Sequence, residues 1–326
     1  MKRRGLKLIE PSVFFVMILL LLPILSFAQE FPTKPINILL GYAPGGSVDV
    51  PFRPLAKAAE KYLGQPIVVS NNGAGGGTVA LGIAAKEKPD GYHLEVCHSS
   101  LFTIVPHIRP IPYKLEEFVP IMNYSAAQSA FSVKADAPWK TLKEVVEYAK
   151  KNPGKFTYFG GAAGSTTHLA MEFVAKAEGV QFTMVPFQGG APALAALLGG
   201  HINGHSGNTF PQAREGSVRL LAVQTEKRIK SFPNIPTFKE LGYDFFNDDM
   251  FFIVAPRGTP AAIVKKVDDA FRRAMEDPLF IEAITRMELL TTYQSSEDLK
   301  KFLDEAYVRN GKMVEEFKIP KEEEKK

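Results

Sequence analysis

The sequence predicts an α/β protein made of two halves, each with short strands and helices around a sheet. Three observations lead to this prediction. The chain has 326 residues, of which 45% are hydrophobic and 23% charged, a composition typical of globular proteins with about two domains. Apolar runs of about five residues alternate with amphipathic segments of helical length, which indicates βαβ units and a mostly parallel sheet. This alternation occurs twice along the chain.

The first set of elements fills the N-terminal third. We expect, in order, strand 36–40, helix 49–63, strand 66–70, helix 78–88 and strand 92–97. Gly64 marks the end of the first helix, because glycine readily takes the left-handed conformation found at helix C-termini. Four prolines between residues 99 and 125 then argue against a long helix in that stretch.

The second set fills the middle of the chain. We expect strand 130–133, a helix ending at 151, strand 156–159, helix 165–177, strand 182–186, helix 191–198 and strands 201–205 and 218–224. Thr141 and Glu144 match a capping box, so the first of these helices begins after Thr141. Gly179 is the expected stop of the second helix.

A helical return completes the chain. Residues 250–255 are a further apolar strand, and Pro260 suits the first turn of a helix because it lacks an N–H. Residues 261–318 read as two or three amphipathic helices. The charged residues 321–326 are expected to be a solvated tail.

Residues 1–28 have the order of a secretory signal peptide. Four basic residues precede an apolar run, 13–25, and Ser26-Phe27-Ala28 supplies a cleavage site with small residues. The run is too short for a bilayer, which needs roughly 20 apolar residues. We therefore expect cleavage, and a mature protein that works outside the cytoplasm.

Removal of this segment changes the charge balance. It takes four of the 39 basic and one of the 35 acidic residues, which leaves 35 and 34. A near-neutral chain gives no electrostatic reason to expect nucleic-acid binding. The single cysteine, Cys97, excludes a disulfide framework and any multi-thiolate metal site.

Two glycine-rich loops occupy equivalent places in the two sets. Loop 42–49 (Tyr-Ala-Pro-Gly-Gly-Ser-Val-Asp) and loop 160–168 (Gly-Gly-Ala-Ala-Gly-Ser-Thr-Thr-His) each follow a strand and open a helix. The first N–H groups of a helix lack internal partners, and the helix dipole adds positive charge there. Glycines also let a ligand approach the backbone. The loops therefore suit a carboxylate or phosphate.

Each loop alone is also explained by tight turns and helix caps. Their occurrence in both halves favours one shared cleft, in which facing helix N-termini hold the carboxylates of a small molecule. No lysine or arginine occurs in either loop, so backbone dipoles would supply the positive charge.

Several short motifs lie in order along nearly the whole mature chain. They are 31–36 (FPTKPI), 43–49 (APGGSVD), 71–77 (NNGAGGG), 89–92 (PDGY), 164–169 (GSTTHL), 185–194 (VPFQGGAPAL), 198–200 (LGG), 219–223 (RLLAV), 233–237 (PNIPT) and 255–260 (APRGTP). With these motifs the chain resembles the Bug family, the periplasmic solute receptors of tripartite tricarboxylate transporters.

The resemblance implies a type II periplasmic-binding-protein fold, with two α/β domains, a central cleft and two crossing strands. It implies a non-enzymatic receptor without metal or cofactor, which captures a small organic carboxylate, such as a di- or tricarboxylate, for a membrane permease. The binding residues it implies are Tyr42, Ala43, Pro44, Gly45, Gly46, Ser47, Asp49, Ser99, Ser100, Gly161, Ala162, Ala163, Gly164, Ser165, Thr166, His168, Gly207 and Asn208. Asp49 would fix the first loop, and His168 would orient the second or touch the ligand.

The chain also departs from the family pattern. Gly207 stands where many relatives carry Asp, and Gln188 stands where Lys is frequent. Met250 occupies a common Trp position. These differences put the identity of the ligand in doubt more than the fold.

Other readings of the sequence stay open at this point. A secreted hydrolase would use Ser165 or Ser206 with a histidine. His201 and His205 have a spacing that aligns metal ligands only on a helix. Residues 75–80 match a dinucleotide-binding pattern, which is a poor fit to an exported protein.

The domain division follows from the crossing strands that the resemblance implies. We expect a discontinuous domain I, 30–127 plus 250–326, and a domain II, 128–249. We expect a monomer, whose partner is a permease of the tripartite tricarboxylate type or, alternatively, a sensor protein.

Overall fold

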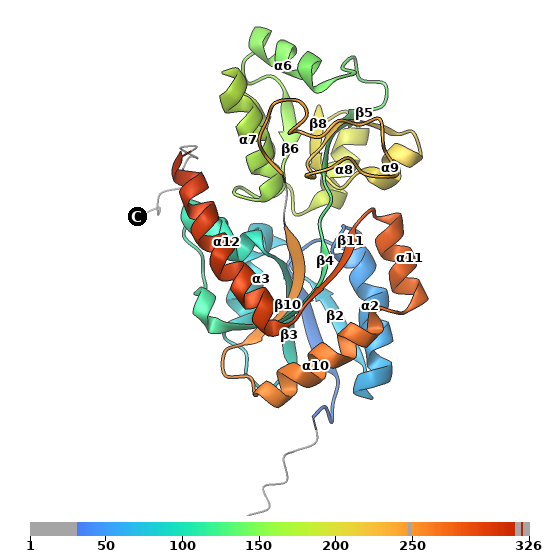
Figure 1. Cartoon of the computed structure of the whole chain (residues 1–326), viewed down its shortest axis with the longest axis vertical. Helices are drawn as coiled ribbons and strands as arrows, with labels where there is room; N and C mark the ends of the chain where they lie inside the picture. The colour runs from blue at the N-terminus through green and yellow to red at the C-terminus, as the bar shows by residue number, and fades with distance from the viewer. Residues whose placement is uncertain (1–30, 247–248, 317–320, 322–326) are drawn as a thin grey trace, which may run out of the picture.

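The computed structural model describes residues 31–246, 249–316 and 321. It has two lobes, one above the other in Figure 1, each around its own sheet. The expected signal peptide, 1–28, and all of the expected tail except Lys321 lie outside the described residues. No described helix combines the length and the apolar character needed to cross a membrane.

Lobe I surrounds a six-stranded sheet with the order β11-β4-β10-β3-β1-β2. Its strands are β1 (Ile36–Leu40), β2 (Ile67–Asn71), β3 (His93–His98), β4 (Phe118–Ala126), β10 (Met250–Pro256) and β11 (Leu290–Gln294). Its helices are α2 (Asp49–Leu63), α3 (Thr78–Ala84), α4 (Ser100–Thr103), α5 (Val105–Ile108), α10 (Ala261–Ala274), α11 (Pro278–Arg286) and α12 (Ser296–Glu316), with short 3-10 turns η1 (Ala74–Gly77) and η2 (Leu115–Glu117).

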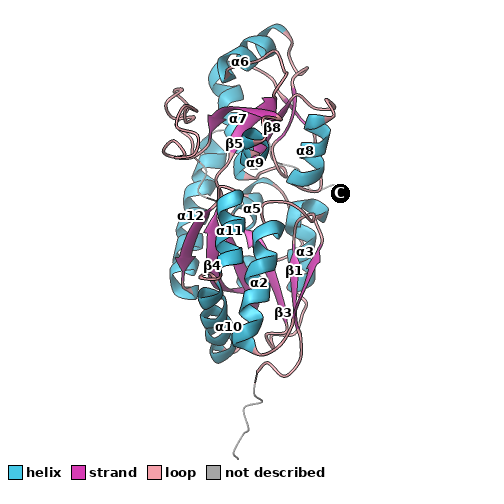
Figure 2. Ribbon diagram, turned by 90° about the vertical axis from the view of Figure 1, so that its right-hand side faces the viewer, coloured by secondary structure: helices cyan, strands magenta, loops and turns pink. Residues whose placement is uncertain are grey.

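Lobe II surrounds a five-stranded sheet with the order β7-β6-β8-β5-β9. Its strands are β5 (Ala130–Lys134), β6 (Thr157–Phe159), β7 (Thr183–Met184), β8 (Gly204–Gly207) and β9 (Val218–Val223). Its helices are α6 (Leu142–Lys151), α7 (Thr166–Glu178), α8 (Gly190–Leu198) and α9 (Phe210–Arg214). Figure 2 shows the helices of both lobes packed around the sheets.

Both sheets are mixed, whereas the sequence predicts mostly parallel ones. β1 is parallel to β2 and to β3, but β10 is antiparallel to both of its neighbours. In lobe II, β5 is antiparallel to β8 and β9. β10 and β5 each enter a lobe where the chain crosses between the sheets, so a local βαβ pattern does not reveal their direction.

Local signals in the sequence place several boundaries correctly. α2 ends at Gly64, which takes the left-handed conformation with φ 72°. Thr141 caps α6 by accepting a hydrogen bond from the Glu144 N–H at 3.2 Å. Gly179, with φ 64°, ends α7.

Other boundaries differ from the prediction. β8 begins at Gly204 and not at residue 201, and α3 ends at Ala84 and not at 88. β4 lies in the proline-containing stretch, and β11 lies in the stretch expected to be helical. β11 pairs with β4 only between Asn123 and Ala126. Pro120 therefore has no partner strand on that side, and β4 can include it although proline cannot donate a backbone hydrogen bond.

Apolar packing also joins the lobes on one side. Ile104 and Ile108 of lobe I belong to the same buried cluster as the core of lobe II. So does Val314, near the end of α12, which runs from lobe I toward lobe II in Figure 1. The residues at the crossings, 127–129 and Asp249, thus have packed lobes on both sides.

Candidate functional site

A cavity of about 440 Å³ lies between the lobes. Lobe I contributes the β1–α2 loop, Gly73 and Gly76, the end of β3 and the α11–β11 turn. Lobe II contributes the β6–α7 loop, the β7–α8 loop and the end of β8. Residues 127–129 and Asp249, where the chain crosses between lobes, line it as well.

The structure brings twelve of the eighteen expected site residues to this cavity. They are Tyr42, Ala43, Gly45, Gly46, Ser47, Ser100, Gly161, Ala162, Ser165, Thr166, Gly207 and Asn208. The other six do not line the cavity, and they are Pro44, Asp49, Ser99, Ala163, Gly164 and His168.

Asp49 and His168 hold the two loops from behind. The Asp49 carboxylate accepts a hydrogen bond from the Gly45 N–H at 2.9 Å and pairs with Arg53. Burial would raise the pKa of Asp49, but the hydrogen bond from Arg53 and those from Gly45 and Asn71 more than offset it, so the pKa is lowered. His168 accepts from the Gly164 N–H at 3.1 Å through Nδ1.

Two helices begin at the cavity without a side-chain cap. α2 begins directly after lining residues 45–48, and α8 begins at Gly190 after the lining residues Gln188 and Gly189. Uncapped helix starts present backbone N–H groups and positive dipole ends, which suit a carboxylate.

The second loop is different, because its helix is already capped. Ser165 accepts from the His168 N–H at 3.3 Å and therefore occupies the start of α7. The second helix that begins at the cavity without a side-chain cap is thus α8, which the sequence analysis did not single out. The signal was the loop Phe187–Gly190, which opens a helix without Ser, Thr, Asp or Asn at the cap position.

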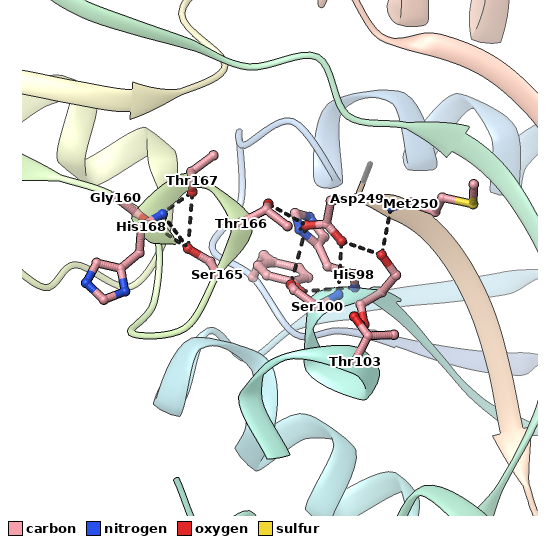
Figure 3. A network of polar contacts seen from close by, with 12 residues as sticks. His98, Ser100, Thr103, Gly160, Ser165, Thr166, Thr167, His168, Asp249 and Met250 are labelled. Carbon is pink, nitrogen blue, oxygen red and sulfur yellow. Dashed lines mark hydrogen bonds and ion pairs between the residues drawn. The ribbon is translucent and has the colours of Figure 1, made fainter. Parts of the chain in front are cut away.

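A polar cluster joins the lobes beside the cavity (Figure 3). Asp249, only 2% exposed, receives hydrogen bonds from Ser99 Oγ at 2.7 Å and from the Ser100 N–H at 3.0 Å, and His98 Nδ1 lies 2.8 Å from its Oδ2. Thr166, at the start of α7, reaches the same carboxylate at 3.5 Å. Asp249 is thus bonded to groups from both lobes.

The charge state of Asp249 follows from these contacts. Burial opposes ionisation, but the adjacent His98 ring and the hydrogen bonds from Ser99 and Ser100 more than offset it, so the pKa of Asp249 is lowered. His98 stacks between Tyr42 and Phe251, with ring centroids 4.5 and 4.4 Å away. Neither Asp249 nor His98 was expected in the site, because both lie outside the motifs and the face of a strand end cannot be read from sequence.

His205 is a second histidine on the cavity wall. It is fully buried beside the ring of Phe159, at a centroid distance of 4.9 Å. Burial lowers the pKa of His205 to about 4, so its side chain is neutral near pH 7. Asp249, Glu215 and Arg286 are the lining residues with charged side chains, and the last two are exposed at the rim.

The two serines of the hydrolase reading are bonded to backbone carbonyls. Ser165 Oγ donates to Gly160 at 2.6 Å, and Ser206 Oγ donates to Thr167 at 2.7 Å. Neither hydroxyl is hydrogen-bonded to an imidazole nitrogen, so the geometry does not make a nucleophile–base pair. Across the described ranges, no three His, Cys, Asp or Glu side chains gather at a place that could hold a metal ion.

Comparison with known proteins adds a family to this geometry. Residues 51–319 match the family model described as the tripartite tricarboxylate transporter family receptor. The chain is 36% identical to the UPF0065 protein in the gbd 5' region of Cupriavidus necator, over 92% of both chains.

Three solved structures share the fold over most of the chain. The periplasmic binding protein BugD has a TM-score of 0.84 and 29% identity, and covers 90% of this chain and 100% of its own. MatC from Rhodopseudomonas palustris with bound malate has a TM-score of 0.82 and 27% identity, over 87% and 100%. A second R. palustris protein, with adipate, has a TM-score of 0.83 and 25% identity, over 90% and 100%.

Proposed function

Because the chain belongs to the tripartite tricarboxylate transporter receptor family, and so is a solute-binding protein and not an enzyme, we propose that it captures a small organic carboxylate in the periplasm for a membrane permease. The resemblance to the Bug receptors, inferred from the motifs, is confirmed by these relatives. Location in the periplasm further rests on the signal peptide pattern of residues 1–28.

The observation that carries the carboxylate proposal is the pair of uncapped helix starts at one cavity. α2 comes from lobe I and α8 from lobe II, and Gly45 and Ala191 face each other across the cleft, since a Cβ on Gly45 would lie 3.9 Å from Ala191 Cβ. One carboxylate bound by both starts would hold the lobes together. Relatives of the same fold are described with malate and with adipate, both dicarboxylates.

We also propose that the chain works as two domains, 30–127 plus 250–326 and 128–249, that close over the ligand. The strands of the two sheets come from these separate parts of the chain. A monomer is sufficient for this mode of binding, because both sides of the cavity belong to one chain.

A thermal-shift screen of the mature protein tests the proposal. Malate, adipate, citrate, glutamate and benzoate are added at millimolar concentration, and at least one is expected to raise the melting temperature by several degrees, since ligand at ~100 times its Kd stabilises by about 2.7 kcal/mol. Ester substrates are expected to show no turnover. Failure of every acid to stabilise the protein, together with ester cleavage lost on Ser165→Ala, would favour a hydrolase.

Delivery to a permease needs a separate measurement. Uptake of the labelled acid is compared in cells with and without the receptor gene. Loss of uptake supports transport, whereas unchanged uptake with a lost transcriptional response to the acid would indicate a receptor for a sensor.

A further inference from the structure

The turn between α11 and β11 has an unusual residue at a position that favours glycine. The Leu289 N–H bonds to the Ile284 carbonyl and the Glu288 N–H to the Thr285 carbonyl, each at 3.1 Å. This is the hydrogen-bond pattern of a Schellman helix end, whose left-handed residue is usually glycine. Here that residue is Glu288, with φ 51°.

Among the described residues, Glu288 is the one non-glycine residue with a positive φ. The side chain makes this conformation unfavourable, because Cβ approaches the following carbonyl oxygen. The same chain ends α7 with Gly179 at φ 64°, in a pattern that also includes a bond from the Val180 N–H to the Ala175 carbonyl. A glutamate kept at such a place needs a compensating contact elsewhere.

That contact is with the other lobe. The Glu288 carboxylate pairs with the Arg214 guanidinium, at the end of α9, and accepts a hydrogen bond from Ser231 Oγ at 3.0 Å. Glu288 is largely buried there, at 9% exposure. We call Glu288, Arg214 and Ser231 the rim cluster.

Backbone groups of the same turn are held by lobe II as well. Asn208 Nδ2 donates to the Met287 carbonyl at 2.5 Å, and Arg214 Nη1 donates to the Arg286 carbonyl at 3.2 Å. Arg286, Met287 and Asn208 all line the cavity. The rim cluster therefore lies at the cavity mouth and joins the two lobes around it.

We propose that Glu288 is a positioning residue for ligand capture. Its backbone in lobe I is strained, and its carboxylate makes contacts with lobe II that exist only when the cleft is closed. This inference rests on the proposed function. When the lobes separate, the carboxylate loses its partners and the strain stays. When they close on a ligand, the rim cluster forms and slows ligand release.

The decisive variant is Glu288→Gly in the full mature chain, which relieves the strain and removes the carboxylate. Without ligand, the melting temperature is expected to rise by about 2–4 °C. Affinity is measured by calorimetry with the acid that binds tightest among malate, adipate, citrate, glutamate and benzoate. It is expected to fall about tenfold, a value that allows for the partial exposure of Arg214. If Glu288 had a merely structural role, the melting temperature and the affinity would not change in opposite directions.

Two matched variants separate strain from contact. Glu288→Ala keeps the unfavourable φ and loses the carboxylate, so affinity should fall equally without a rise in melting temperature. Gly179→Ala introduces strain at the same kind of helix end, where a Cβ has no atom within 4 Å. It should lower the melting temperature and leave affinity unchanged.

Small-angle scattering provides an independent readout. At a ligand concentration that closes the wild type, Glu288→Gly should keep a larger radius of gyration, which contracts only at higher ligand concentration. If an acid binds wild type and Glu288→Gly equally well, or if Glu288→Gly lowers stability, the inference is wrong and the proposed function stands. If no acid binds the wild type, the proposed function fails and the inference fails with it.

Discussion

At the scale of single residues, burial gives the two cavity histidines different electrostatic surroundings. His98 lies beside the ionised Asp249, between two aromatic rings. His205 faces no carboxylate within the described residues, and both of its ring nitrogens are buried without a hydrogen-bond partner there. Burial lowers the pKa of His205 from 6.5 to about 4. His98 thus contacts a carboxylate, whereas His205 contributes a neutral part of the wall.

The His205 shift predicts a pH dependence of stability. Between pH 6.5 and pH 4 the unfolded chain binds a proton at His205 that the folded chain does not, so stability falls as pH decreases through this window. The difference between a pKa of 6.5 in the unfolded chain and about 4 in the folded chain corresponds to ~3 kcal/mol at the acid end. Urea unfolding at several pH values should show a smaller loss for His205→Leu than for wild type.

The control for this prediction is an exposed histidine of the same lobe. His201 is exposed and outside the cavity, so His201→Asn should lose stability with pH as the wild type does. If His205→Leu and wild type lose stability in parallel between pH 6.5 and 4, the proposed neutral state of His205 is wrong.

Sequence reasoning locates residues of the site through local rules and misses those that depend on tertiary contacts. Gly45 and Asp49 follow from a strand–loop–helix pattern that is complete within a few residues. Asp249 belongs to the site only because the crossing places it against His98 and Thr166, residues 151 and 83 positions away. No local pattern carries that information.

At the scale of elements, the lobes approach each other through loops that differ in their residues and contacts. η1 has three successive left-handed glycines, 75 to 77, and Arg109 Nη2 donates to the Gly75 carbonyl at 2.7 Å. A Cβ on Gly76 would lie only 2.2 Å from Ala162 Cβ in lobe II. The rim cluster is a second contact between the lobes, and it joins them through polar and charged groups.

Gly76→Ala should therefore oppose closure. The added methyl group occupies the place where the β6–α7 loop approaches, so the affinity for the acid should fall at least tenfold while the fold is kept. Calorimetry measures the affinity, and circular dichroism confirms folding. Gly75→Ala is the matched control, because its φ of 60° gives similar strain but its Cβ meets Thr78, at the start of α3 in the same lobe. Equal affinities of the two variants would contradict the prediction.

The helices and strands themselves show which parts of the fold are determined by the local sequence. α2 and β1 have the bounds that the sequence predicts, because a clear period and a glycine stop define them. β11 (LTTYQ) has few apolar residues, and it is a strand because β4 offers a free edge to pair with. Pro120 argues against a strand in the sequence, yet the register of β4 with β10 includes Pro120, which lies opposite Val254.

At the scale of the whole molecule, the charge distribution suits capture of an anion without a strong field. The chain without residues 1–28 has 35 basic and 34 acidic residues. At the rim, Arg286 and Glu215 oppose each other in sign, and within the cavity Asp249 is paired with His98. We propose that the attraction for a carboxylate comes from the starts of α2 and α8, and such an attraction acts over a short range.

This arrangement predicts a ligand association rate with weak salt dependence. Long-range steering falls steeply with ionic strength, because the Debye length shrinks from ~10 Å at 0.1 M to ~3 Å at 1 M. Dipoles at two helix starts act within the cavity and are screened much less. Stopped-flow measurements with a dicarboxylate between 50 and 500 mM salt should therefore show less than about a threefold change in rate. A decrease of tenfold or more would mean that a charged surface steers the ligand, and Arg286→Gln would then identify the rim as its source.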